Sequence, residues 1–254
     1  MNMDTKKLID YTLHLADNAL IIGHRNSEWC GHGPILEQDI AITNIALDMI
    51  GQARNFYQYA AQLTGNGATE DSLAYLRDAI DFKNNLLAEL PNGDWAQTVL
   101  RQFFFSTYQY FLYQQLQNSS DAQLAAIAEK SLKEVTYHLR WSSEWVIRLG
   151  DGTEESKRRI LHAIDEIWSF TGELSVPVSY ELLAVSEGIG VDLSIVKTEW
   201  NKKITTVFEE ATLPMPSDTI WMQSGGKEGK HTEQLGYILA EMQFLQRAYP
   251  NSNW

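Results

Sequence analysis

Glu134 and His138 are the two side chains of this sequence whose type and spacing best fit chemistry. They lie four residues apart within residues 121–149, where apolar residues recur at helical spacing. Both side chains therefore lie on one face of a predicted helix, and that face is otherwise apolar. Helix bundles build buried metal sites from carboxylates and imidazoles on inward faces. We expect the pair to consist of hydrogen-bonded buried groups or partly exposed ones; the alternative is a mononuclear metal site formed with Asp48.

A complete di-iron site is not predicted. Ferritin-like di-iron proteins take a Glu-x-x-His pair from each of two helices, because side chains three residues apart can reach one metal. Glu228 and His231 have this spacing, but they lie in a glycine-rich stretch without helical periodicity. Glu134 and His138 are one residue further apart than the motif requires. The spacing of the candidate ligands therefore argues against a complete di-iron centre.

Two further stretches contain reactive residue types. Residues 24–34 hold His24, Glu28, Cys30 and His32, which suggests a metal loop, but Gly31, Gly33 and Pro34 are typical of a turn between helices. Gly225-Gly226-Lys227 would suit an anion, although no strand precedes it as in a phosphate-binding loop. Cys30 is the single cysteine, so an intrachain disulfide and a multi-cysteine metal site are excluded.

The periodicity of apolar residues predicts an all-α protein of eight or nine helices. No strand-like alternation and no internal repeat are visible, and the length suits a single domain over residues 1–254. Residues 212–230 are rich in glycine and proline and are predicted to be a functional or partner-facing loop. The predicted helices cover Asp4 to about Gly23, 35–63, 71–90, 94–117, 121–149, 154–171, 178–187, 192–211 and 232–249.

The helix predicted over residues 35–63 carries two apolar stripes separated by a polar seam. This seam is either the solvated face or an interior surface that faces Glu134 and His138. The first stripe contains Ile42, Ile45, Met49, Ala53 and Phe56, the second Leu36, Ile40, Leu47 and Ile50, and the seam Glu37, Asn44, Asp48 and Asn55.

Charge and hydropathy exclude several functions. The net charge is −13, which opposes binding to nucleic acid or to anionic membrane surfaces. The N-terminal residues lack the apolar stretch of a secretory signal, and no stretch approaches the length that a membrane span requires. We therefore expect a cytoplasmic protein without nucleic-acid or membrane partners.

Long blocks of the chain closely resemble the PaaC family, the structural subunits of phenylacetyl-CoA epoxidases. They include HRNSEWCGHGPILEQDIAITNIALDMIGQAR at residues 24–54, LPNGDWAQTVLRQF at 90–103 and KEVTYHLRWSSEWVIRLGDGTEES at 133–156. The resemblance implies a ferritin-like helical bundle with extra helices. It also implies membership of a multicomponent monooxygenase, which uses O2 and an NADPH-dependent reductase to epoxidise phenylacetyl-CoA in aerobic phenylacetate catabolism.

The resemblance further implies how the work is divided in that complex. The di-iron cofactor is expected in the related catalytic subunit, PaaA, and no cofactor is expected in this chain, whose partners are PaaA and the other epoxidase subunits. By resemblance, Asn44, Asp48, Glu134 and His138 occupy the region of a lost metal site, and no catalytic or metal-binding residue is assigned. Helix 94–117 with its aromatic residues, the connector 24–34 and the loop 212–230 are candidate docking surfaces.

Two other functions compete with this one. The first is a self-sufficient di-metal carboxylate oxygenase with atypical ligands, which would bind metal and turn over with O2 alone. The second is a self-associating helical scaffold, and a homodimer of the chain alone is also considered. Metal content and the choice of partner would separate these classes.

Overall fold

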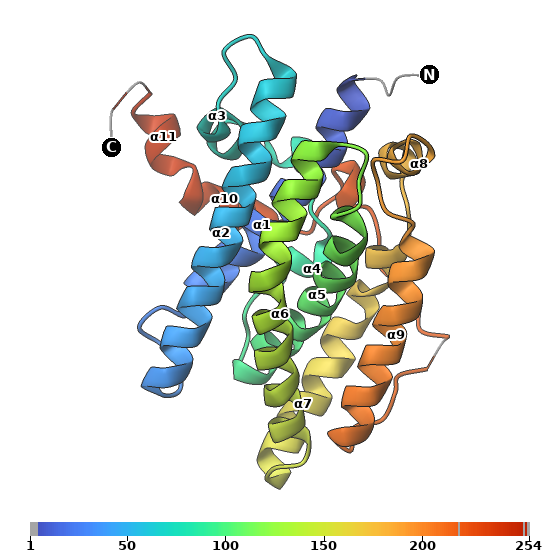
Figure 1. Ribbon diagram of the computed structural model, residues 1–254. Coiled ribbons are helices and arrows are strands. Elements are labelled where there is room, and N and C mark those ends of the chain that lie inside the picture. The colour runs from blue at the N-terminus through green and yellow to red at the C-terminus, as the bar shows by residue number, and fades with distance from the viewer. Residues whose placement is uncertain (1–4, 218, 251, 253–254) are drawn as a thin grey trace. The chain divides into compact units, whose positions relative to one another are not determined.

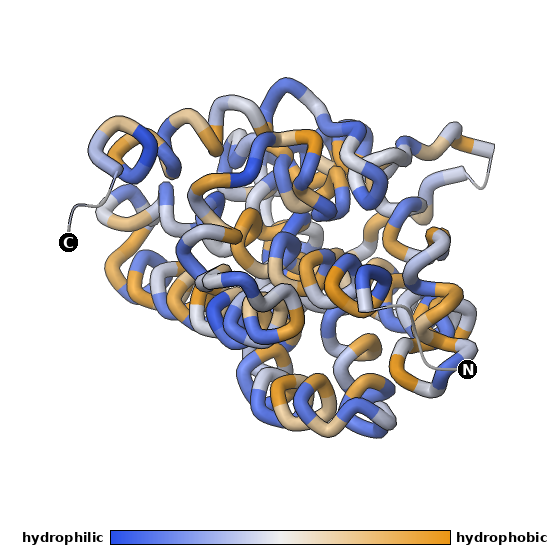
Figure 2. Tube along the Cα trace, turned by 90° about the horizontal axis from the view of Figure 1, so that it is seen from above, coloured by the Kyte–Doolittle hydropathy of each residue, from blue (hydrophilic) through white to orange (hydrophobic). Residues whose placement is uncertain are grey.

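The described part of the chain is entirely helical apart from its turns and loops. The structure is a computed structural model, and it describes residues 5–217, 219–250 and 252. Within these residues no β-strand occurs, which confirms the predicted all-α, ferritin-like fold class. Apolar and polar residues alternate along most helices (Figure 2), as expected for amphipathic helices that bury one face.

The chain divides into two compact units. The first unit contains Met1–Pro91, Val178–Glu187 and Gly225–Trp254, and the second contains Asn92–Pro177 and Gly188–Ser224. The first unit is thus assembled from three separate stretches of sequence. The prediction of one domain over residues 1–254 stays a prediction.

The first unit is built around the long helices α1, Thr5–Ser27, and α2, Leu36–Thr64, which pack side by side as a helical hairpin (Figure 1). The short helices α4, Leu86–Glu89, and α8, Ser179–Ser186, pack against α1. Helix α3, Glu70–Tyr75, contacts α2, while α10, Glu233–Met242, contacts α4 and α11, Phe244–Ala248. The predicted start of the first helix at Asp4 lies outside the described residues.

The second unit is built around another helical hairpin, made of α5, Trp95–Leu116, and α6, Ala122–Gly150. Helices α7, Glu154–Ile167, and α9, Leu193–Glu210, both pack against α5 and α6. Its aromatic core centres on Phe104. The centre of the Phe104 ring lies 5.7 Å from the ring centre of Trp168 and 5.6 Å from that of Trp200. The indole N–H of Trp200 also donates to the Phe104 carbonyl at 2.9 Å, so that α9 is fixed to α5.

The prediction of one helix over residues 71–90 is wrong. This stretch contains α3, the 3₁₀ turn η1, Ala79–Asp81, and α4, separated by irregular backbone. The backbone N–H of Lys83 donates to Asp17 at 2.8 Å, and that of Asn85 donates to Asn18 at 2.8 Å. These N–H groups bond to side chains of α1 instead of closing helical turns, so tertiary contacts outweigh the helical periodicity.

The predicted helix over 232–249 is interrupted at one residue. Helix α10 ends at Met242 and α11 begins at Phe244. The side chain of Gln243 is buried at the break, and it donates to the carbonyls of Ala74 at 3.1 Å and Arg77 at 3.0 Å. The C-terminal helices are thereby joined to α3.

Local signals locate most other helix ends, but α1 continues to Ser27 beyond the predicted Gly23, and α7 ends at Ile167, before the predicted Thr171, where the 3₁₀ turn η2, Trp168–Phe170, follows. Asp94 and Gln97 form the predicted capping box at the start of α5, and Thr153 caps α7 as predicted. Residues 212–230 contain no α-helix within the described positions, only the 3₁₀ turn η4, Gly226–Glu228. None of the helices in the described part of the chain is both long and apolar enough to cross a membrane.

Candidate functional site

The four residues of the predicted polar site lie on two helices in different units. Asn44 is exposed and Asp48 is half-buried on α2, whereas Glu134 is half-buried and His138 is buried on α6. Glu134 and His138 share one helix, as their spacing predicts. The grouping of all four stays a prediction.

Helix α5 bears directly on metal binding because it offers no metal-ligating side chain. From Trp95 to Leu116 its sequence contains no Asp, Glu, His or Cys, and its buried polar residues include the neutral Gln102, Ser106 and Gln109. A ferritin-like di-metal site takes a carboxylate from each of its four long helices. Across the residues that the structure describes, no cluster of three or more His, Cys, Asp or Glu side chains is placed to hold a metal ion.

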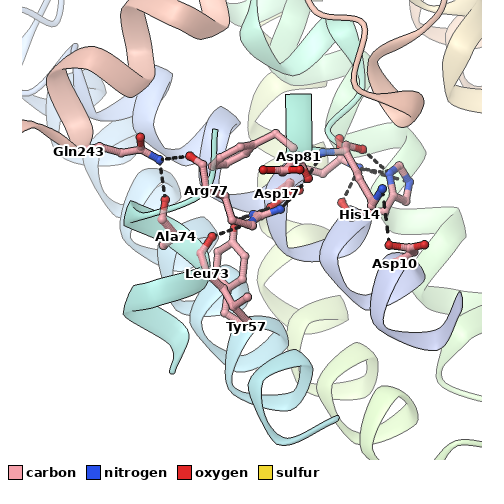
Figure 3. Close-up of polar contacts among 12 residues, drawn as sticks. Asp10, His14, Asp17, Tyr57, Leu73, Ala74, Arg77, Asp81 and Gln243 are labelled. Atoms are coloured by element: carbon pink, nitrogen blue, oxygen red, sulfur yellow. Dashed lines mark hydrogen bonds and ion pairs between the residues drawn. The ribbon is translucent and has the colours of Figure 1, made fainter. Parts of the chain in front are cut away.

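The first unit instead buries an extensive network of charged groups, part of which is drawn in Figure 3. One centre of the network is Asp17 of α1, which is fully buried. Its carboxylate accepts hydrogen bonds from the Tyr57 hydroxyl at 2.5 Å, from the Arg77 guanidinium and from the Lys83 backbone N–H at 2.8 Å. Burial, followed by the nearby Asp17 charge, raises the pKa of Tyr57, so that its hydroxyl keeps the proton that it donates.

Arg77 supplies the positive charge for this centre. Besides Asp17 it donates to the carbonyl of Asp81 at 2.9 Å, and its guanidinium lies 4.2 Å from the centre of the Phe82 ring. Its own carbonyl accepts from Gln243 and from Arg247 at 2.9 Å. Arg77 also donates to the hydroxyl of Tyr57 on α2 at 3.2 Å. It therefore connects α1, α2 and the C-terminal helices, in the arrangement visible in Figure 3.

A second centre pairs Glu181 of α8 with Lys227. The Lys227 ammonium lies 3.0 Å from each carboxylate oxygen of Glu181, and both side chains are almost completely buried. The Nε2 atom of His14 lies 3.5 Å from Glu181, and its Nδ1 atom lies 2.7 Å from the Lys83 carbonyl. Burial lowers the pKa of His14, so its imidazole is neutral at pH 7 and donates from Nδ1.

Glycine makes the burial of Lys227 possible. A Cβ atom on Gly226 would lie 2.4 Å from the Asn84 carbonyl, so this backbone approach excludes any larger residue. Gly225 adopts a φ of 130°, which other residues rarely reach. The suggestion that Gly225-Gly226-Lys227 binds an anion is wrong, because the ammonium of Lys227 is sequestered by Glu181.

Glu89 of α4 forms the third centre. Its buried carboxylate accepts hydrogen bonds from Asn84 at 2.9 Å and from the Thr232 backbone N–H at 2.6 Å, and it pairs with Nδ1 of His231 at 2.8 Å. The Nε2 atom of His231 lies 2.9 Å from the Phe82 carbonyl, so both ring nitrogens face acceptors. Burial opposes protonation, but the hydrogen bond and charge of Glu89 outweigh it and raise the pKa of His231.

These three centres balance buried acids with buried bases and join parts of the chain that are far apart in sequence. Unpaired buried charges are costly, whereas paired and hydrogen-bonded ones define a single arrangement. The network is therefore suited to holding α1, α8 and the C-terminal stretch in register. Sequence reasoning missed it, although His14 and Asp17 stand among the apolar residues Leu13, Leu15 and Ala16 of α1 and were a usable signal.

The connector predicted over residues 24–34 is a turn only from residue 28 onward, as its glycines and proline indicate, because residues 24–27 form the end of α1. The Gly33 N–H donates to the Asp39 carboxylate at 2.8 Å, and Nδ1 of His32 lies 3.1 Å from the Cys30 carbonyl. Cys30 and His32 are both exposed. The alternative of a metal loop here gains no support from these contacts.

The aromatic residues of α5 belong mainly to the core. Phe103, Phe104, Phe105, Tyr108 and Tyr113 are buried, and Tyr110 and Phe111 are half-buried. Core packing, the simpler interpretation of this helix, is therefore correct. The expectation that exposed aromatic residues of α5 form a docking surface is not supported, because these residues have little exposed area.

Comparison with known proteins shows similarity along the whole chain. The profile described as phenylacetic acid catabolic protein matches residues 1–254. The C subunit of the 1,2-phenylacetyl-CoA epoxidase of Escherichia coli (strain K12) is 46% identical over 248 residues, which cover 98% of this chain and 99% of that protein. The resemblance seen in the sequence blocks is therefore confirmed.

Proposed function

Because this chain belongs to the phenylacetic acid catabolic protein family, we propose that it is a non-catalytic subunit of a multicomponent phenylacetyl-CoA epoxidase. In this role it supports a related catalytic subunit of the PaaA type, which holds the di-iron cofactor. The similarity to the C subunit of the E. coli epoxidase supports this assignment. We also infer that the protein acts in the cytoplasm, where an acyl-CoA substrate is available.

The observation that carries the non-catalytic role is the composition of α5. One of the two long helices of the second unit offers neither a carboxylate nor an imidazole over its full length. A ferritin-like metal centre draws carboxylates from every helix of the bundle, so this chain cannot supply the usual set. Glu134 and His138 on α6 would be the remnant of such a set.

The buried network supports a structural role. Asp17 is paired with Arg77, Glu181 with Lys227 and Glu89 with His231, so these three buried carboxylates stabilise the fold and are not available to a metal. A catalytic di-iron subunit needs its ligands held within narrow limits of distance and angle. A rigid helical subunit packed against it would restrict the movement of the helices that carry those ligands.

Metal content and partner binding test this proposal together. The chain is expressed alone with iron supplied, purified and analysed for metal, and it is then mixed with the purified catalytic subunit. We expect negligible iron in the chain alone and a stable complex that contains the iron of its partner. About two irons per chain, with O2-dependent turnover by the chain alone, would instead establish the self-sufficient di-metal oxygenase.

A further inference from the structure

Helix α2 presents an apolar stripe to solvent in addition to the stripe that it buries. The buried stripe, Ile42, Ile45, Met49, Ala53 and Phe56, packs into the core of the first unit. The second stripe remains exposed: Leu36 is 71% exposed, Ile40 52%, Leu47 61% and Ile50 40%. We call these four residues the exposed stripe of α2. Contiguous exposed apolar residues of this kind on a stable protein commonly mark interaction sites.

The spacing within the exposed stripe fits a helical partner. Leu36 and Ile40 are four residues apart, and Leu47 and Ile50 are three apart, with Thr43 at the intervening position. This alternation of four and three is the heptad spacing of helices that pack together at a crossing angle near 20°. From Leu36 to Ile50 the stripe extends over about 21 Å, so it matches some four turns of a partner helix.

Charge argues against a second copy of this chain as the occupant. The chain has a net charge of −13, so two copies repel each other. Glu37 is exposed and Asp48 half-buried beside the stripe, and the exposed Arg54 at its far end lies 3.5 Å from Glu70. A complementary helix would therefore carry Lys or Arg beside its own apolar residues.

We propose that the exposed stripe of α2 is the docking surface for an amphipathic helix of a different polypeptide, with basic residues flanking the apolar face of that helix. This inference rests on the proposed function, under which that polypeptide is the catalytic subunit of the epoxidase. The docking surface is thus on α2, and not on the aromatic residues of α5. The stripe was visible in the sequence, but only the structure shows which of the two stripes is exposed.

The test introduces a charge into the stripe and measures binding to the purified catalytic subunit by titration calorimetry. Leu47→Asp removes the most exposed apolar residue of the central turns, and Leu36→Asp alters the first turn, where an acidic residue favours the helix. Each variant is expected to weaken binding at least about tenfold. Ile195→Asp, at an exposed apolar position in the first turn of α9, is the matched control and should bind like the wild type.

A charge variant tests the chemistry of the partner. Glu37→Lys should weaken binding, and wild-type binding should fall as salt rises, because the proposed partner helix is basic. Thermal unfolding followed by circular dichroism checks that each variant is folded. If Leu47→Asp does not fold, binding is measured with Leu36→Asp instead.

Each other outcome has a definite meaning. Equal binding by the wild type and by both stripe variants would refute this inference and leave the proposed function intact. If the wild type fails to bind the catalytic subunit, the proposed function fails and the inference fails with it. If sedimentation shows that Leu47→Asp dissociates a homodimer while binding to the catalytic subunit is unchanged, the stripe is a self-association surface and the proposed partner is wrong.

Discussion

The Lys227 ammonium lies 3.0 Å from both carboxylate oxygens of Glu181, although the two residues are 46 positions apart and both are buried. This pair connects α8 to the turn that leads into the C-terminal helices. Its position in the first unit explains how stretches from the middle and the end of the chain become part of a unit otherwise formed by the first 91 residues.

Removing one partner of this pair should be severely destabilising. Lys227→Met leaves the Glu181 carboxylate buried without its cation, so we expect the free energy of unfolding to fall by about 3–5 kcal/mol. Urea denaturation followed by circular dichroism measures the change. Lys197→Met, at an exposed position of α9, is the control and should change it by less than about 0.5 kcal/mol.

A double variant distinguishes the loss of charge balance from a loss of packing. Combining Lys227→Met with Glu181→Gln removes both charges, and we expect it to be more stable than Lys227→Met alone. A double variant that is less stable by the sum of the two single effects would show that charge pairing is not the cause.

The pair of His231 and Glu89 should make stability depend on pH. The pKa of His231 is raised above its ordinary value of 6.5, so the folded protein holds this proton more tightly than the unfolded chain. The stabilisation is fully present below pH 6.5, and it is lost as the pH rises through the raised pKa of the folded state.

The free energies of unfolding of the wild type and of His231→Gln should therefore differ most at acidic pH. Urea denaturation between about pH 5.5 and pH 8.5 should show a stability difference that shrinks as the pH rises. The pKa of His14 is lowered, so this residue changes the pH dependence of stability in the opposite direction. Because His14 is present in both proteins, its contribution cancels in the stability difference. A difference that is constant with pH would contradict a charged His231.

The hydroxyl of Tyr57 should contribute measurably to stability. Tyr57→Phe removes the donor that lies 2.5 Å from Asp17, and it leaves this buried carboxylate with fewer hydrogen bonds. The expected loss in the free energy of unfolding is about 1–3 kcal/mol, measured by denaturation in urea. Tyr237→Phe, at an exposed position of α10, should have almost no effect. Equal losses in the two variants would refute a special role for the contact with Asp17.

The capping box of α5 provides a further test. Asp94 accepts from the N–H groups of Ala96 at 2.9 Å and Gln97 at 3.1 Å, so Asp94→Ala removes the cap and should cost about 1 kcal/mol. The midpoint of thermal unfolding should fall accordingly. Asp165→Ala, at an exposed position within α7, removes a similar charge without a cap and is expected to leave the midpoint nearly unchanged.

Neighbouring residues in the sequence were sufficient to predict most of the helices and to argue against a di-iron centre. The capping box at Asp94 and the stop near Gly150 depend on neighbouring residues, so both could be predicted from sequence. The spacing of Glu134 and His138 depends only on helical geometry, and the absence of carboxylates from α5 can be read directly once the helix is known.

The interruptions of the predicted helices after Tyr75 and at Gln243 could not be predicted in this way. Both stretches have helical periodicity, but their polar groups bond to residues of other elements, such as Asp17 and Ala74. Such contacts compete with helical hydrogen bonds only after the chain has folded. Periodicity carries no information about them.

The sequence by itself determined the all-α class, the positions of most helix ends, the family resemblance and the two apolar stripes of α2, because each depends on residues close together in the chain. Only the tertiary structure decided which stripe is buried, that Lys227 pairs with Glu181, and that Glu89 pairs with His231. Those relationships join residues from separate stretches of sequence. Whether a charge is buried and paired depends on which stretches meet in the folded protein, so spacing along the chain does not predict it.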